Sequence, residues 1–150
     1  TMTRSPYAPN YRGLVDALID LKDGFPTFVP FRVGFDATTF EAVSQGDALY
    51  LRAADGQAGK AIANDTLDKA YVVGFADTSK GAGEVVKVLV TGVEAISGLD
   101  AGDHYFLSSS SAGAITTTAP STPGEYVVRV GEAVSASEFS IQLEPPILLS

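Results

Sequence analysis

The chain has 150 residues, of which 45% are hydrophobic and none is cysteine. A domain of this size buries roughly 68–70% of its unfolded surface, so it needs neither disulfides nor thiolate metal sites to form a core. The formal net charge of −8 repels phosphate backbones and disfavours direct nucleic-acid binding. No apolar run approaches the roughly 20 residues of a membrane span and no signal peptide is recognisable, so we expect no membrane partner.

The N-terminal segment predicts an extended arm followed by a short helix. Two prolines favour an extended backbone over residues 1–10. Asn10 is a good N-cap, and Gly24 ends the helical pattern that follows it. The apolar residues at helical spacing are Tyr11, Leu14, Val15, Leu18 and Leu21. A helix of about 12 residues is marginal in water, so we expect it to pack on its own domain or on a neighbouring chain. The chain then divides into an arm-and-helix region, residues 1–24, and a β domain, residues 25–150.

Beyond Gly24 the hydrophobic period changes from helical to alternating. Short runs rich in β-branched and aromatic residues, broken by Gly, Asp, Ser and Pro, predict a series of strands. They are residues 28–33, 40–43, 48–52, 60–63, 71–76, 84–91, 104–108, 114–117, 126–134 and 139–143. So many short strands at close spacing indicate an all-β fold, a small barrel or sandwich.

Two phrases occur twice in the chain. Gly46-Asp47-Ala48-Leu49-Tyr50-Leu51 returns 56 residues later as Gly102-Asp103-His104-Tyr105-Phe106-Leu107, and the Tyr-Val-Val run at residue 71 has a looser echo at residue 126. Repetition at a fixed spacing indicates a duplicated supersecondary unit. We therefore expect Asp47 and Asp103 to occupy corresponding turn positions, with Tyr50 and Phe106 or Leu107 directed to a shared core.

The last residues combine two prolines with three large apolar side chains. Pro145 and Pro146 end any strand ladder, and Ile147, Leu148 and Leu149 follow them. Such a tail either folds back on its own barrel or lies as a contact arm on another subunit, with the proline pair as a stiff spacer. The sequence leaves both interpretations open.

Aromatic residues gather near the start of the chain, at Tyr7, Tyr11, Phe25, Phe28, Phe31 and Phe35. Core or subunit packing explains them better than a sugar-binding platform, because such side chains are usually buried. Together with the apolar tail, they exceed what one small barrel hides, which predicts a homotrimer. The residues predicted to contact a capsid or a neighbouring subunit are Tyr7, Tyr11, Leu14, Leu18, Phe25, Phe28, Ile147, Leu148 and Leu149.

The sequence holds no recognisable catalytic assembly. His104 is the only histidine, and a triad needs positioned partners or a Gly-x-Ser-x-Gly elbow that the chain lacks. Residues 56–60 have the wrong glycine spacing for a phosphate loop, and Ala61 stands where a magnesium-binding Ser or Thr belongs. The aspartates mostly stand singly beside Gly, Asn or Thr, as in turns rather than calcium sites. We expect no enzymatic activity, no cofactor and no bound metal.

Residues 46–51, the Lys60-Ala61 step before residues 72–76, and residues 99–107 and 123–133 are the characteristic strand-and-turn phrases. Through them the run 46–143 resembles the small β-rich modules of tailed-bacteriophage structural proteins, especially capsid decoration (cement) proteins and fibre or appendage proteins. The resemblance does not cover the segment up to about residue 40. It implies a non-enzymatic virion component, commonly trimeric, that meets the major capsid protein on the capsid surface or anchors an appendage.

Two functions follow from that resemblance. In the first, the chain is a cement whose arms and helix clasp the shell while the barrels trimerise above it. In the second, it is a fibre or adhesion module whose loops, such as Ser108 to Gly113, bind a host glycan. Arms that order on binding suit the first function, because they wrap a large surface and lose their entropy only on contact.

Overall fold

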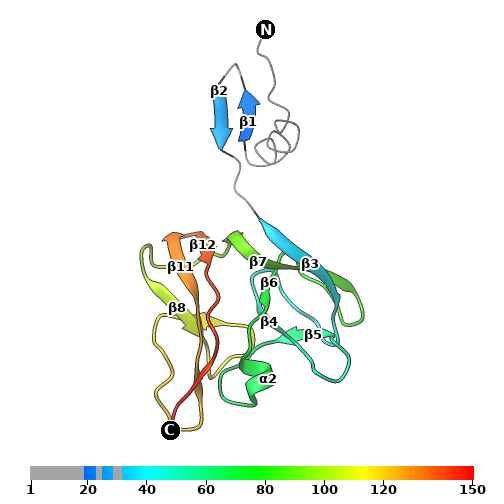
Figure 1. Ribbon diagram of the computed structural model, residues 1–150, viewed down its shortest axis with the longest axis vertical. Helices are drawn as coiled ribbons and strands as arrows, with labels where there is room; N and C mark the ends of the chain where they lie inside the picture. The colour runs from blue at the N-terminus through cyan, green and yellow to red at the C-terminus, as the bar shows by residue number, and fades with distance from the viewer. Residues whose placement is uncertain (1–18, 23–24, 29–31) are drawn as a thin grey trace, which may run out of the picture. The chain divides into compact units, whose positions relative to one another are not determined.

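The computed structural model describes residues 19–22, 25–28 and 32–150. The chain divides into two compact units, residues 1–31 and residues 32–150, and each is described by itself (Figure 1).

In the first unit, β1 (Ile19–Lys22) pairs antiparallel with β2 (Phe25–Phe28). The prediction of a helix that reaches Leu21 is therefore wrong. The register leaves only Asp23 and Gly24 between the two strands, and Asp-Gly is a strong signal for a two-residue hairpin loop. The Asp-Gly signal thus outweighs the helical pattern at residues 19–22. The predicted arm and the rest of the predicted helix lie outside the described residues.

The second unit confirms the all-β prediction. Its elements are β3 (Val33–Thr38), β4 (Ala48–Leu51), β5 (Ala58–Lys60), α2 (Leu67–Ala70), β6 (Gly74–Ala76), β7 (Val85–Ala95), β8 (His104–Leu107), β9 (Ile115–Thr116), β10 (Tyr126–Val127), β11 (Arg129–Ser135), β12 (Glu138–Ile141) and β13 (Ile147–Leu148). A nine-stranded sheet has the order β5-β4-β6-β7-β12-β11-β8-β9, with β3 also paired to β7. The sheet curls into a half-barrel (Figure 1), and β10 pairs with β13 beside it.

Some predicted strands have different bounds. Residues 40–43 form no strand, and only Thr39 and Val43 make isolated bridges there. The strand predicted at 60–63 lies earlier, as β5, while residues 71–73 precede β6 instead of belonging to it. These shifts follow from turns and close packing, which the alternation of side chains does not encode.

The sheet contains one arrangement twice. The order β5-β4-β6-β7 in residues 32–91, the first half, returns as β9-β8-β11-β12 in residues 92–150, the second half. β7 serves both halves: β3 pairs with its residues 85–91, and its residues 92–95 pair with β12. The end of β7 therefore takes the place in the second half that β3 takes in the first.

Each Gly-Asp turn exchanges two backbone hydrogen bonds with one buried alanine. The Gly46 N–H donates to the Ala76 carbonyl and the Ala76 N–H donates to the Asp47 carbonyl, both at 2.9 Å. Ala133 makes the same exchange with residues 102–103, at 2.7 and 3.0 Å. The turn glycines have φ of 89° and 87°, a conformation that favours glycine. The two aspartates therefore occupy corresponding positions, as the repetition predicts.

Two apolar clusters form the core. One lies within the first half and comprises Val43, Leu49, Ala58, Ala76, Val86 and Val88. The other spans both halves and contains Tyr50 and Leu107, as expected, whereas Phe106 is only half-buried. In this cluster the ring centroid of Phe139 lies 5.4 Å from that of Phe75 and 5.8 Å from that of Tyr105. The two halves thus share one core.

The segment after β5 joins the two halves through its backbone. The Ala63 N–H donates to the Ser108 carbonyl at 3.0 Å, and the Ala63 carbonyl accepts from the Tyr126 N–H at 2.9 Å. The Gly113 N–H donates to the Ala61 carbonyl at 2.7 Å. Both alanines are fully buried, so a larger side chain at either position would overpack the junction.

Candidate functional site

Within the described residues, titratable side chains form no metal-binding group: no three of His, Cys, Asp and Glu are placed to hold an ion there. Residues 56–60 are no phosphate loop: the Gly56 N–H donates to the Arg52 carbonyl at 2.7 Å and closes a turn over residues 52–56, and residues 58–60 are β5. Among the helices of the described part of the chain, none has the length and apolar character needed to span a bilayer.

His104 is engaged by an arginine rather than by a nucleophile. Arg129 donates to His104 Nδ1 from Nε at 3.1 Å, and its Nη2 lies 2.7 Å from the same atom. Arg129 also donates to Gln142 at 3.2 Å and to Glu144 at 3.3 Å. The cluster joins β8, β11 and the segment after β12, and it offers no hydroxyl or thiol for the imidazole to activate.

Glu94 is the one buried carboxylate of the described residues, with 2% of its surface exposed. Its Oε1 accepts from Gln45 Nε2 at 2.7 Å and from the Ala95 N–H at 2.9 Å, while Oε2 has no hydrogen-bond partner in the described ranges. Arg32 Nη2 lies 3.7 Å from Oε2 and 2.9 Å from Asp77 Oδ1. Burial raises the pKa of Glu94. The group ties the residue before β3 to β7, and sequence reasoning missed it because its members are scattered along the chain.

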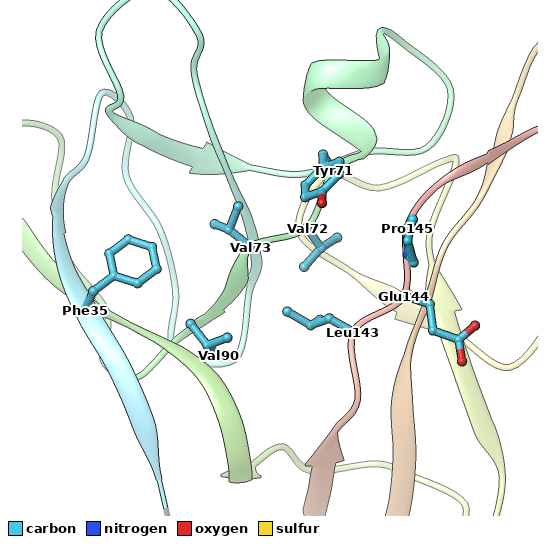
Figure 2. A pocket seen from close by; sticks show the side chains of 8 residues that line it. All are labelled: Phe35, Tyr71, Val72, Val73, Val90, Leu143, Glu144 and Pro145. Carbon is cyan, nitrogen blue, oxygen red and sulfur yellow. The ribbon is translucent and has the colours of Figure 1, made fainter.

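An open apolar groove of about 400 Å³ lies between β3, β7, the segment before β6 and the segment after β12. We call it the apolar groove, and its lining residues are Phe35, Tyr71, Val72, Val73, Val90, Leu143, Glu144 and Pro145. In Figure 2 the side chain of Leu143 extends into the space between Val72 and Val90, whereas the Glu144 carboxylate points away from it. That carboxylate is paired with Arg129. The groove therefore offers mainly apolar contact.

The apolar tail lies on its own domain by its backbone but exposes its side chains. Leu148 pairs with Tyr126 and Ile147 with Val127, forming what we call the β10–β13 ribbon. The Leu149 N–H also donates to the Glu125 carbonyl at 2.9 Å. Ile147 and Leu148 are nevertheless 63% and 59% exposed, while Leu149 is half-buried. The tail thus folds back, and its contact with another subunit stays a prediction.

The serine-rich loop is held together by one of its own hydroxyls. Ser108 is buried, and its Oγ accepts from the N–H groups of Ser110 and Ser111, both at 3.1 Å. Ser110 and Ser111 are exposed. Ser108 is therefore a structural residue of the loop, and two neighbouring residues are open to solvent.

The remaining predicted contact residues are not brought together by the described structure. Tyr7, Tyr11, Leu14 and Leu18 lie outside the described residues. Phe25 and Phe28 are the two ends of β2, where Phe28 pairs with Ile19. Sequence reasoning missed the apolar groove, because its residues come from four separate segments, although Phe35 was noted as part of an aromatic cluster.

No family model matches this sequence, and no curated protein shows significant similarity to it. The resemblance to phage structural proteins therefore rests on the strand-and-turn phrases alone.

Proposed function

We propose that the chain is a non-enzymatic structural protein of a bacteriophage virion, a capsid decoration (cement) protein. In this role it binds the major capsid protein on the outer surface of the head as a homotrimer. The observation that carries the proposal is the pair of large apolar side chains, Ile147 and Leu148, displayed to solvent on β13. An apolar surface displayed in this way favours burial against another protein.

The body of the molecule supports a mechanical role. Its two halves share the core cluster around Phe75 and Phe139, and the Ala61 to Ala63 segment joins them by backbone hydrogen bonds. Close packing of this kind gives low compressibility and transmits strain. A stiff body with an apolar contact surface suits a protein that reinforces a pressurised shell.

The test uses virions of the phage that encodes the chain. Purified particles with and without the gene are heated while DNA release is followed by dye fluorescence, and the purified protein is then added back to the deficient particles. We expect the deficient particles to release DNA at a lower temperature and added protein to restore the original value. Equal release temperatures, or immunogold labelling confined to tail fibres, would contradict the cement role.

The adhesion module remains the second candidate because Ser110 and Ser111 are exposed on the serine-rich loop. Glycan-array binding by the purified chain, lost in a Ser110→Ala, Ser111→Ala double variant, would favour it. The matched control is a Thr117→Ala, Thr118→Ala double variant, which removes two exposed hydroxyls from the following loop and should leave such binding intact.

A further inference from the structure

We propose that Arg32, Asp77 and Glu94 form a pH-controlled clamp, which holds the first residues of β3 and releases them when Glu94 takes up a proton. Arg32 is the first residue of the second unit, and β3 begins directly after it. The clamp therefore controls how the chain enters β3. The inference is independent of the cement role, because it concerns only contacts within the second unit.

The closed clamp joins three segments that lie far apart in the sequence. Arg32 Nη2 is 2.9 Å from Oδ1 of Asp77, after β6, and 3.7 Å from Oε2 of Glu94, on β7. The side chains of Arg32 and Asp77 are 42% and 29% exposed, whereas that of Glu94 is 2% exposed. Its Oε2 has no hydrogen-bond partner among the described residues. Arg32 is thus the only cation in this part of the chain that pairs with the buried carboxylate.

Protonation of Glu94 removes the charge that faces Arg32. Burial raises the pKa of Glu94 above its ordinary value of 4.5, and the neighbouring Asp77 carboxylate adds to the rise while Arg32 opposes it. A raised folded pKa stabilises the fold fully below pH 4.5, and that contribution is lost as pH rises through the folded pKa. A neutral carboxyl group is also cheaper to bury than a charged one. Protonation therefore opens the clamp without destabilising the domain.

Arg32 and Asp77 are the charged groups that face Glu94. The turn before β4 contributes Gln45, whose Nε2 donates to Glu94 Oε1 at 2.7 Å, and β12 contributes Phe139, the ladder partner of Glu94. Both of these side chains are uncharged, so they hold Glu94 in place in either protonation state. Once Glu94 is neutral, only the pair of Arg32 and Asp77 remains. A pair this exposed contributes little in water, so Arg32 is released.

The start of β3 is separated from the rest of its ladder with β7 (Figure 1). Val33 pairs with Thr91. The next residue, Gly34, pairs with Leu89, so the register shifts between them, and such a bulge disrupts the ladder locally. From Gly34 onward the two strands are in close contact, since a Cβ atom there would clash with the backbone of β7. The first two residues therefore detach alone, and their release adds about 7 Å to the connection that leads to the first unit.

The test follows the mobility of a spin label on the full chain, which is straightforward because the chain has no cysteine. One label is attached to Val33→Cys at the start of β3, and the control label to Thr38→Cys at the end of the same strand; both positions are exposed. Electron paramagnetic resonance spectra are recorded from about pH 8 to about pH 4.5. We expect the ratio of mobile to immobile label at residue 33 to rise about fivefold as pH falls. The label at residue 38 should keep its spectrum.

Two variants should make the clamp independent of pH. Glu94→Gln imitates the protonated acid, and Arg32→Gln removes the cation while keeping Glu94. In each, the label at residue 33 should be mobile at every pH, while far-ultraviolet circular dichroism shows that the sheet is retained. The matched control is Asp36→Asn, which neutralises an exposed carboxylate elsewhere on β3 and should keep the pH response of the intact chain.

Three outcomes would overturn the clamp. The first is a label at residue 33 that stays immobile over the whole pH range. The second is a pH response that survives in Glu94→Gln, because another group would then be titrating. The third applies even if Glu94→Gln fails to fold: a label that stays immobile at neutral pH in Arg32→Gln would show that Arg32 does not hold the start of β3.

Discussion

The carboxyl group of Asp47 lies against Gly113, a residue of the other half of the molecule. A Cβ atom at Gly113 would come within 2.9 Å of Asp47 Cγ. The Gly113 carbonyl also accepts from the Ala48 N–H at 2.9 Å, and its φ is 81°. The turn that opens β4 is therefore packed on the loop that follows β8, and the contact requires a residue without a side chain.

Gly113→Ala should lower the free energy of unfolding by about 2–4 kcal/mol, because the methyl group meets Asp47 and the backbone stays in the left-handed region. The matched control is Gly98→Ala, where φ is 77° but a Cβ would have nothing within 4 Å. It should lose only about 1–2 kcal/mol. Urea unfolding of both variants measures the difference, and equal losses would show that the contact with Asp47 carries no weight.

Asp47→Asn should make stability less dependent on pH. Burial raises the pKa of Asp47 above its ordinary value of 3.8, despite the hydrogen bond from the Ser44 N–H. A raised folded pKa stabilises the protein fully below pH 3.8 and loses that contribution as pH rises through the folded pKa. Asparagine keeps the hydrogen bond without the charge, so the variant should show a smaller loss of stability on going from pH 3.5 to neutral pH. Unfolding by urea across this window tests it, with Asp103→Asn, the exposed counterpart in the second half, as the control.

Arg32 and Glu94 should be energetically coupled. Arg32→Ala removes the cation nearest to the unpartnered Glu94 Oε2, at 3.7 Å, and should destabilise the protein. The same change in a Glu94→Gln background should cost less, with a coupling of about 1 kcal/mol, because Arg32 is partly exposed and solvent screens the pair. A double-mutant cycle at neutral pH gives this value. Additive effects would mean that Asp77 alone holds the guanidinium.

Phe139→Ala should destabilise both halves together. The Phe139 ring is fully buried and packs on Phe75 from the first half. A cavity of that size costs about 3–5 kcal/mol. Because the cluster spans both halves, tyrosine fluorescence and far-ultraviolet circular dichroism should report one coincident transition at a lower urea concentration. Two separate transitions would show that the halves unfold independently.

The duplication was predictable from the repeated Gly-Asp phrase. The turn before the strand requires glycine at a positive φ, so a glycine recurs at the same position in each copy. The alternation of apolar residues likewise predicted the strand that became β7. Val86 and Val88 of this strand are buried in one apolar cluster, and Leu89 belongs to the other. Helical spacing misled the interpretation of Ile19 to Lys22, since an Asp-Gly dipeptide follows them. The periodicity of apolar residues reflects only neighbours along the chain, and it did not indicate that these residues pair with β2.

The surfaces that carry the proposals were much harder to foresee. The apolar groove is built from residues as distant as Phe35 and Pro145, and Glu94 meets a glutamine 49 positions away. Such contacts depend on strand order, which no local pattern contains. The tail was recognised as apolar from its composition, but its pairing with β10 depends on the path of the chain between Ile141 and Ile147.

Because β7 is a member of both halves, the molecule cannot be cut into two complete copies of its repeat. A cut on either side of β7 leaves one of the two copies without a strand that it needs. In the second half, β12 holds the place that residues 85–91 of β7 hold in the first half. If β12 continued beyond Ile141 as β7 continues beyond residue 91, that extension would be the first strand of a third copy. Pro145 and Pro146 interrupt that path, since proline lacks the N–H that a ladder requires.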